Sequence, residues 1–278
     1  MWFYIARRVN LFVFTVAVLF LLVFVMLNAL PGELATNLSG IQNPTIAQYD
    51  AIVSQYQLDK SWFNQYISFI KQRIHGDFGV SFSDGKPIFD EMLRLLPATI
   101  ELCIYAMTIA LLLGLPLGII AAVYYKKFGD FFLLGTSLIG YSIPVFWLGV
   151  IAIMYFGLDL QWLPVAGQLN LLYQVEHITG FTLIDIYLSN IEYKQLAYQD
   201  AIAHLIMPTL TLAVIPATVV IRITRTTMLE ELNANYIKAA QARGQHPLSV
   251  IFHHALPNAI QPVLSQITLQ LSTLLTSA

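Results

Sequence analysis

Charged residues and cysteines are both scarce in this sequence. Asp, Glu, Lys and Arg make up 11% of the 278 residues, whereas 57% of the residues are hydrophobic. Because soluble domains contain about 25% charged residues, this composition excludes an ordinary soluble domain. The one cysteine, Cys103, excludes an intrachain disulfide and a cysteine-based metal cluster. We interpret it as a small apolar residue of the core.

The sequence also lacks the motifs of several enzyme classes. The nearest approach to a phosphate-binding loop, Gly79 with Gly85-Lys86, has one residue too many between the glycines and continues with Pro87 instead of Ser or Thr. Neither H-E-x-x-H nor G-x-S-x-G occurs. The chain therefore has no residues for ATP hydrolysis of its own, for a metalloprotease or for a serine hydrolase.

Histidines do not supply a metal site either. His253 and His254 are adjacent, and His246 lies seven residues before His253. Neighbouring side chains on a helix point about 100° apart, which is unsuitable for chelating one ion. We therefore expect no metal site, no catalytic residue and no cofactor bound directly to this chain.

What the sequence does contain is a series of long windows without Asp, Glu, Lys or Arg. The mean hydropathy of the chain is +0.68. A helix needs about 20 residues to cross an apolar layer of about 30 Å, and each window reaches that length. The first is longer than the apolar core of a signal peptide and has no A-x-A-type site after it, so we interpret it as a retained helix. The sequence predicts an all-α polytopic integral membrane protein with five helices, over Val9–Gly32, Leu102–Tyr125, Phe131–Leu158, Ala201–Ile221 and Ala255–Ala278.

Basic residues are concentrated in the segments that become cytoplasmic if the N terminus is cytoplasmic. These segments then hold eight Lys or Arg against three acids, while the rest of the chain holds six against thirteen. Positive residues in short loops favour the cytoplasmic side, so we expect a cytoplasmic N terminus. The eight are Arg7, Arg8, Lys126, Lys127, Arg222, Arg225, Lys238 and Arg243, and the three acids are Asp130, Glu230 and Glu231.

Two long external segments follow from this orientation. The first, Pro31–Pro97, shows helical spacing of apolar residues from Ile46 onward and a second short helix that begins after Ser61 and ends before Gly76. The second, Asp159–Asp200, has no clear period. We divide the chain into an N-terminal helix with its external segment, residues 1–96, and a membrane domain, residues 97–278. No charge follows Arg243, and we expect the natural chain to continue beyond Ala278.

Several residues inside the windows have structural interpretations. Gly114 and Gly118 form a small-residue pattern that favours close helix packing. We interpret Glu101, near the outer edge of its helix, as an interfacial carboxylate reached by water, with an ion relay as the alternative. Three prolines can bend their helices: Pro144, Pro208 and Pro216.

The segment Arg222–Leu256 carries a helix signal of its own. Asn233 can cap a helix start, Gly244 stands where a left-handed residue ends a helix, and Pro247 follows. Between them Tyr236, Ala239, Ala240 and Arg243 recur at helical spacing. Small residues on one face of a short helix permit close approach by another protein surface.

This segment resembles the EAA motif of ABC importer permeases. The residues are Tyr236-Ile-Lys-Ala239-Ala240-Gln-Ala-Arg243-Gly244, then nine residues, then His254-Ala-Leu256-Pro257. In that family the motif forms a coupling helix that sits in a cleft of the ATPase subunit. Lys238 replaces the usual acid and His254 the usual isoleucine. The resemblance implies a coupling role for Tyr236, Lys238, Ala239, Ala240, Arg243, Gly244, Leu256 and Pro257; an ordinary solvated connection is the alternative.

The rest of the chain resembles the first-subunit type of the dipeptide/oligopeptide permease family. The matching segments are Gln57-Leu58-Asp59-Lys60, Gln65-Tyr66, Gly76 to Ser81, Leu96 to Thr99, Ser142 to Trp147, Trp162 to Gly167, Pro208, Arg222 and Arg225. Residues Leu171 to Tyr173 and Ile178 to Asp185 resemble the Sap-type branch, which is associated with antimicrobial peptide uptake and resistance and, in some bacteria, with putrescine export. The resemblance therefore implies peptide import, with putrescine, another polyamine or other small cargo as the alternative.

The resemblance also implies an architecture and partners. The expected fold is the MetI-like permease of a type I ABC importer in the bacterial inner membrane, with six helices, the sixth beyond this sequence. The expected partners are a second homologous permease, two cytoplasmic ATP-binding subunits, a periplasmic substrate-binding protein and membrane lipid, with no nucleic acid. Any ATP is then bound by the partner subunits.

The fifth window has a broad polar face. Lipid does not satisfy so many polar side chains, so this face meets protein or water. One interpretation is packing through interhelical hydrogen bonds, and the other is a translocation path that includes Gln266, Gln270 and Thr273. A secondary transporter would place ionisable groups at mid-membrane, and a structural subunit would need no polar face; both are weaker alternatives.

Overall fold

The computed structural model describes residues 2–29, 33–81 and 83–277. Within these residues every named element is a helix, and the extended pairing is a single bridge between Val80 and Pro87. The predicted all-α class is therefore confirmed. Contacts divide the chain into two units, residues 1–95 and 96–278. Many apolar side chains of the long helices are exposed in the chain without lipid or partner subunits.

The first unit consists of α1 (Trp2–Ala29), α2 (Leu34–Ser39), α3 (Ile46–Tyr56) and α4 (Trp62–Ile74). Both helices predicted for the external segment are present, and Ser61 is the N-cap residue of α4 as expected. Helix α2 was not predicted because its six residues are too few to show a period. The predicted end of the first window, Gly32, and the start of the external segment, Pro31, lie outside the described residues.

The core of this unit is a cluster of aromatic side chains with an arginine packed against it. Phe24 of α1, Tyr56 of α3 and Phe69 of α4 are buried together. Arg73 donates to the carbonyl oxygen of Leu38 at 3.1 Å, and its guanidinium lies 4.7 Å from the centre of the Phe69 ring. A cation over an aromatic ring adds attraction to the packing of the ring itself. The segment between the first two membrane windows is thus a folded structure.

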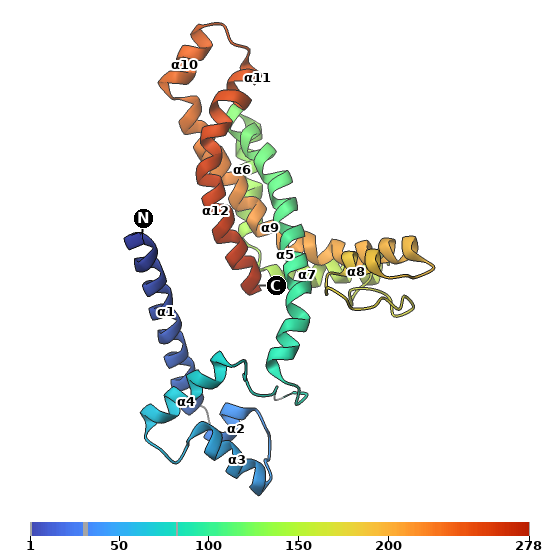
Figure 1. Cartoon of the computed structure of the whole chain (residues 1–278). Helices are drawn as coiled ribbons and strands as arrows, with labels where there is room; N and C mark the ends of the chain where they lie inside the picture. The colour runs from blue at the N-terminus through green and yellow to red at the C-terminus, as the bar shows by residue number, and fades with distance from the viewer. Residues whose placement is uncertain (1, 30–32, 82, 278) are drawn as a thin grey trace. The chain divides into compact units, whose positions relative to one another are not determined.

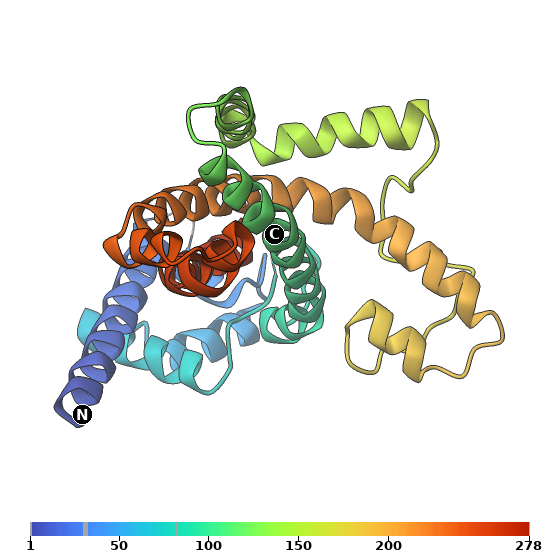
Figure 2. The ribbon, with the colours of Figure 1, turned by 90° about the horizontal axis from the view of Figure 1, so that it is seen from above.

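The second unit is built around one long helix, α9. It comprises α5 (Ile88–Val123, from residue 96), α6 (Phe128–Ser142), α7 (Val145–Ala152), the π-helix η1 (Ile153–Asp159), α8 (Thr182–Leu188), α9 (Lys194–Leu232), α10 (Asn235–Ala242), α11 (Pro247–Ser249), the π-helix η2 (Val250–Ala255) and α12 (Leu256–Ser277). Helices α6, α7, α8, α10 and α12 all contact α9. Figures 1 and 2 show α12 lying along α9, and Figure 1 shows α10 and α11 at one end of this bundle.

The third predicted window does not form one straight helix. α6 ends at Ser142, α7 starts at Val145, and the two halves are bent by 94°. Pro144 has no N–H to donate, and the residue before a proline is pushed towards extended backbone. Ile143 has that conformation, with φ −81° and ψ 126°. The bend expected at Pro144 is confirmed. Pro208 and Pro216 lie inside α9, which is one unbroken helix and changes direction along its length (Figure 1).

Three of the helices described are long and apolar enough to cross a membrane: α1, α5 and α9. The bent pair formed by α6 and residues 145–159 makes a fourth if it is one span. α12 has sufficient length at 22 residues, but its polar face keeps it out of this group. Its assignment as the fifth span therefore stays a prediction, and the predicted last residue, Ala278, lies outside the described residues.

The glycine pair of α5 packs closely on α9, as predicted. A Cβ atom on Gly114 would lie 2.6 Å from Cγ1 of Val220. A Cβ atom on Gly118 would lie 2.6 Å from Cβ of Thr224 and 2.8 Å from the carbonyl oxygen of Ile221. These distances are shorter than van der Waals contact, so the two backbones approach because the glycines have no side chains.

We predict that Gly118→Ala lowers the stability of the protein in detergent by about 1–3 kcal/mol, the usual cost of overpacking. Gly135→Ala in α6 is the matched control, because its new methyl group would meet nothing within 4 Å. This control should be neutral or slightly stabilising, since alanine favours helix more than glycine. Thermal unfolding of both purified variants measures the difference. Equal melting temperatures would contradict the close packing.

Candidate functional site

Helix α10 forms at the place predicted for the coupling helix, with one end corrected. Asn233 does not cap its start: it ends α9, and its side-chain amide donates to the carbonyl oxygen of Leu229 at 2.7 Å. α9 continues this far because residues 226–232 contain no glycine or proline. Ala234 is instead the N-cap residue of α10. At the other end Gly244 has φ +76°, which confirms the predicted left-handed residue.

The two faces of α10 have different environments. Ile237 and Ala240 are buried in a cluster with Met228 of α9 and Val250 of η2. On the other face Lys238, Ala239, Ala242 and Arg243 are exposed. Ala240 therefore packs against the chain's own helices, and Ala239 is the small residue available to another protein. The sequence pattern alone did not separate these two alanines.

Tyr236 connects α10 to both neighbouring helices. Its hydroxyl donates to the Glu231 carboxylate at the end of α9 and accepts from the side-chain amide of Asn258 in α12 at 2.9 Å. Burial raises the pKa of Tyr236 above its usual value, and the Glu231 carboxylate raises it further. The hydroxyl therefore stays protonated at neutral pH and keeps donating. Glu231 and Asn258 were not predicted as site residues, because the sequence does not show that both meet Tyr236, which lies 5 positions after Glu231 and 22 before Asn258.

The two remaining predicted coupling residues lie at the start of α12. Leu256 packs against the cluster that contains Ile237 and Ala240, whereas Pro257 is exposed. His254 precedes them in η2 and is half-buried, with its carbonyl oxygen 3.4 Å from the Tyr236 hydroxyl. The structure thus brings all eight predicted coupling residues to one end of the bundle, around α10 and the start of α12.

Glu101 lies at the opposite end of the bundle, and its interpretation from the sequence is corrected here. This residue is 3% exposed, so it is not an interfacial carboxylate reached by water. Its carboxylate accepts the backbone N–H groups of Thr182 at 2.9 Å and Leu183 at 3.3 Å, and the Tyr105 hydroxyl at 3.2 Å. The first amides of a helix have no partner within it, and Glu101 supplies one to the first turn of α8.

A second buried carboxylate holds the same external segment. Asp185 accepts the backbone N–H groups of Thr179 at 2.7 Å and Gly180 at 2.9 Å, and the Thr179 hydroxyl at 2.6 Å. Burial alone raises the pKa of Asp185, but these hydrogen bonds outweigh it and hold the pKa below its ordinary value. Two carboxylates therefore hold the segment between η1 and α9, together with a small apolar cluster around Ile186 and Ala197.

The predicted path residues of α12 do not share one environment. Gln266 and Gln270 are half-buried, whereas Thr273 is exposed and its hydroxyl donates to the carbonyl oxygen of Leu269 at 3.1 Å. The predicted apolar side is buried at Val263 and Leu274. It is exposed at Leu264 and Leu275, which the pattern had placed on the same side.

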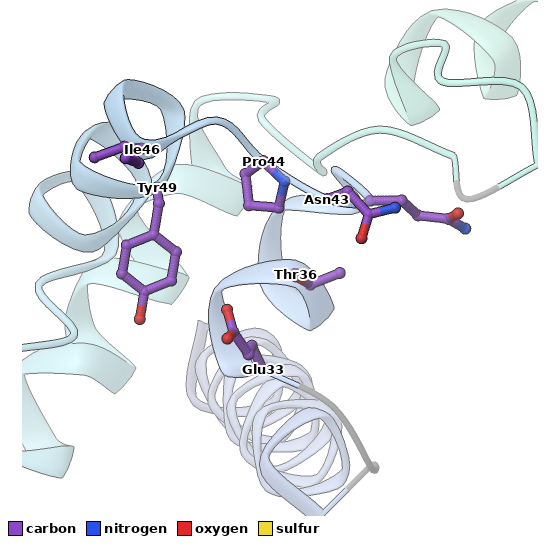
Figure 3. A pocket seen from close by; sticks show the side chains of 7 residues that line it. Glu33, Thr36, Asn43, Pro44, Ile46 and Tyr49 are labelled. Carbon is purple, nitrogen blue, oxygen red and sulfur yellow. The ribbon is translucent and has the colours of Figure 1, made fainter.

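Both units have hollows among the residues described, and the second unit has more than one. In the first unit a hollow of about 810 Å³ lies between the start of α2 and α3, where Glu33, Thr36, Asn43 and Tyr49 line it (Figure 3). In the second unit a hollow of about 380 Å³ lies beside α7 and α9 and includes Ser277 of α12, but none of the predicted path residues. Neither hollow gathers a metal-binding group of side chains among the residues described.

The sequence of this chain matches a transport family. A family model described as "Binding-protein-dependent transport system inner membrane component" matches residues 114–278. The di/tripeptide transport system permease protein DppB of Pseudomonas aeruginosa (strain UCBPP-PA14) is 39% identical over 275 residues, which cover 99% of this chain and 81% of that protein.

Two further relatives carry the name SapB. The peptide transport system permease protein SapB of Escherichia coli O157:H7 is 43% identical over 218 residues, which cover 78% of this chain and 68% of that protein. The protein of Escherichia coli (strain K12) named putrescine export system permease protein SapB has the same identity and coverage. The chain therefore belongs to the family of binding-protein-dependent transport-system inner membrane components, the permease subunits of ABC transporters, and its relatives there are DppB- and SapB-type permeases.

Proposed function

We propose that this permease carries peptides across the bacterial inner membrane and that α10 couples it to separate ATPase subunits. The observation that carries the proposal is the two-sided environment of α10. Its inner face is anchored through Ile237 and Ala240, while Lys238, Ala239 and Arg243 remain exposed. A helix that packs against its own chain on one face and is exposed on the other can transmit a displacement from a partner subunit to the helices it packs against.

The contacts behind α10 support this role. Tyr236 bonds to both α9 and α12, so a displacement of α10 acts on two long helices at once. The exposed face is basic and has a small residue at its centre, which suits a narrow cleft with acidic side chains in the partner. The permease itself makes and breaks no covalent bond in this mechanism, and ATP is bound and hydrolysed by the partner subunits.

Peptide cargo is proposed from the relatives. The DppB and SapB relatives are named for di/tripeptide and peptide transport. Uptake of antimicrobial peptides, with a contribution to resistance, is the Sap-type form of this function. One observation favours a second candidate: a SapB relative is named for putrescine export. Uptake and efflux assays with a labelled dipeptide and with labelled putrescine distinguish the two.

The proposed assembly contains a second homologous permease, two cytoplasmic ATP-binding subunits and a periplasmic substrate-binding protein. The basic residues at the end of the bundle that holds α10 support a cytoplasmic location for this end and for the N terminus. The segments held by Glu101, Asp185 and Arg73 are then external, where the binding protein delivers cargo.

We predict that Ala239→Cys, in a Cys103→Ser background, crosslinks to an ATP-hydrolysing subunit in intact cells with a thiol- and amine-reactive reagent. Ala240→Cys is the matched control, because it introduces the same thiol at the next position of the helix. Ala240 is 1% exposed, so this thiol should not react. Mass spectrometry of the crosslinked product identifies the partner. Labelling of Ala239→Cys from the outside, or its failure to reach an ATPase, would refute the proposed function.

Gly244→Val should uncouple ATP hydrolysis from peptide uptake in the reconstituted transporter. A β-branched residue in the left-handed conformation costs about 1–2 kcal/mol and loosens the end of α10. Steric crowding is not the cause, because a Cβ atom at this position would meet nothing within 4 Å. Gly244→Asn is the control and should transport nearly normally, since asparagine tolerates this conformation. Equal uptake per ATP in the two variants would count against transmission through α10.

A translocation path along α12 can be tested separately. Replacing Gln266, Gln270 or Thr273 by leucine should reduce uptake of a labelled dipeptide while the crosslink from residue 239 persists. Gln261→Leu serves as the control, because Gln261 is an exposed polar residue of the same helix outside the proposed path. Wild-type uptake by all three leucine variants would assign the polar face to helix packing.

A further inference from the structure

A buried ion pair joins α6 to α9 shortly before α9 ends. Asp130, in the first turn of α6, is 1% exposed. Arg225 of α9 donates to both of its carboxylate oxygens, from Nε to Oδ1 at 2.5 Å and from Nη2 to Oδ2 at 2.8 Å. This fork arrangement fixes both distance and orientation between the two helices.

The same carboxylate holds the turn between α5 and α6. Oδ2 of Asp130 accepts the backbone N–H of Lys126 at 3.0 Å, and Lys126 has φ +60°. Residues other than glycine adopt this left-handed conformation only at an energetic cost, so the turn depends on the bond that holds it. The Arg225 guanidinium also lies 5.3 Å from the centre of the Tyr125 ring. Asp130 and Arg225 therefore connect α6, α9 and the α5–α6 turn.

Stability alone does not account for a pair of this kind. Removing two charges from water costs nearly as much as their attraction returns, so well-packed apolar residues of similar size are often as stabilising. What an apolar pair lacks is a defined geometry. The fork permits one alignment of α9 against α6, and this alignment is the property that an apolar replacement would lose.

The position of the pair relates it to α10. Arg225 is followed by uninterrupted helix to Leu232, and α10 begins at Asn235. The residue before Arg225, Thr224, packs against Gly118 of α5. Adjacent helical residues point about 100° apart, so the end of α9 is held against α5 on one side and α6 on the other. The residues from Arg225 to Leu232 include no proline or glycine, the usual causes of a kink. We therefore expect this part of α9 to stay straight between the pair and α10.

We propose that Asp130 and Arg225 are positioning residues that transmit movement of α10 to α6 and to the α5–α6 turn. This inference rests on the proposed coupling function of α10. The pair stays closed during the transport cycle, so that α10, the end of α9 and the start of α6 move as one body. The movement then reaches the bend at Pro144 and α7 behind it.

The test measures hydrogen exchange in the complete complex in lipid nanodiscs, with and without ATP and vanadate. In the wild type, nucleotide should change the exchange of α10 and also of residues 124–135. In Asp130→Asn and Arg225→Lys the response of α10 should persist, while the response of residues 124–135 should fall at least about fivefold, the lower range of coupling between sites. Arg225→Lys keeps the charge and loses the fork.

Two controls separate transmission from folding. Arg222→Lys changes an exposed arginine one turn earlier on α9, whose guanidinium lies 5.6 Å from the centre of the Tyr141 ring of α6. Lysine keeps the charge there without a fork being lost, so both responses should stay unchanged. The double variant Asp130→Leu with Arg225→Met leaves no unpaired charge, so it should assemble and still lose the response of residues 124–135. Assembly of the complex is followed by size-exclusion chromatography for each variant.

The outcomes distinguish this inference from the proposed function. A wild-type response of residues 124–135 in the double variant, or no response there in the wild type, overturns the role of the pair while α10 can still couple. Failure of both Asp130→Asn and the double variant to assemble makes the pair a folding element and also overturns it. If α10 of the wild type neither responds to nucleotide nor crosslinks from residue 239, the proposed function itself fails.

Discussion

The close contact between α5 and α9 is the constraint on which the second unit depends. Without side chains at Gly114 and Gly118, the two backbones approach until Val220 and Thr224 fill the space that a Cβ atom would need. Lipid offers no hydrophobic driving force between helices, so such contacts and a few polar bonds must hold a membrane bundle together. The remaining helices then pack around α9, and α10 lies where α9 ends.

This arrangement separates two kinds of polar interaction. At one end of the bundle Glu101 and Asp185 accept backbone amides and give an irregular segment a fixed shape. At the other end Asp130, Arg225, Tyr236 and Glu231 bond side chain to side chain between helices. The first kind builds a stable surface. The second kind fixes how helices are oriented to one another, which is what a transporter has to control.

Much of this structure could be predicted from the sequence, because apolar length and helical spacing are local properties. The long helices α1, α5 and α9 followed from such patterns, as did α3, α4, α10 and the left-handed Gly244. Residues whose role depends on a distant partner could not be predicted. Asp130 and Arg225 lie 95 positions apart, and Glu101 meets α8 some 81 positions later. Asn233 was misassigned for a related reason, since a capping residue looks the same at the end of one helix as at the start of the next.

The hydroxyl groups of α12 restrict what the helix can bind. Thr268, Thr273 and Thr276 each donate to a carbonyl oxygen of their own helix, at 3.3, 3.1 and 2.8 Å. The protons of these hydroxyls are already used within the helix, so towards a neighbour the three oxygens can only accept hydrogen bonds. This part of α12 therefore suits surroundings that donate hydrogen bonds, such as water or the N–H and O–H groups of another helix.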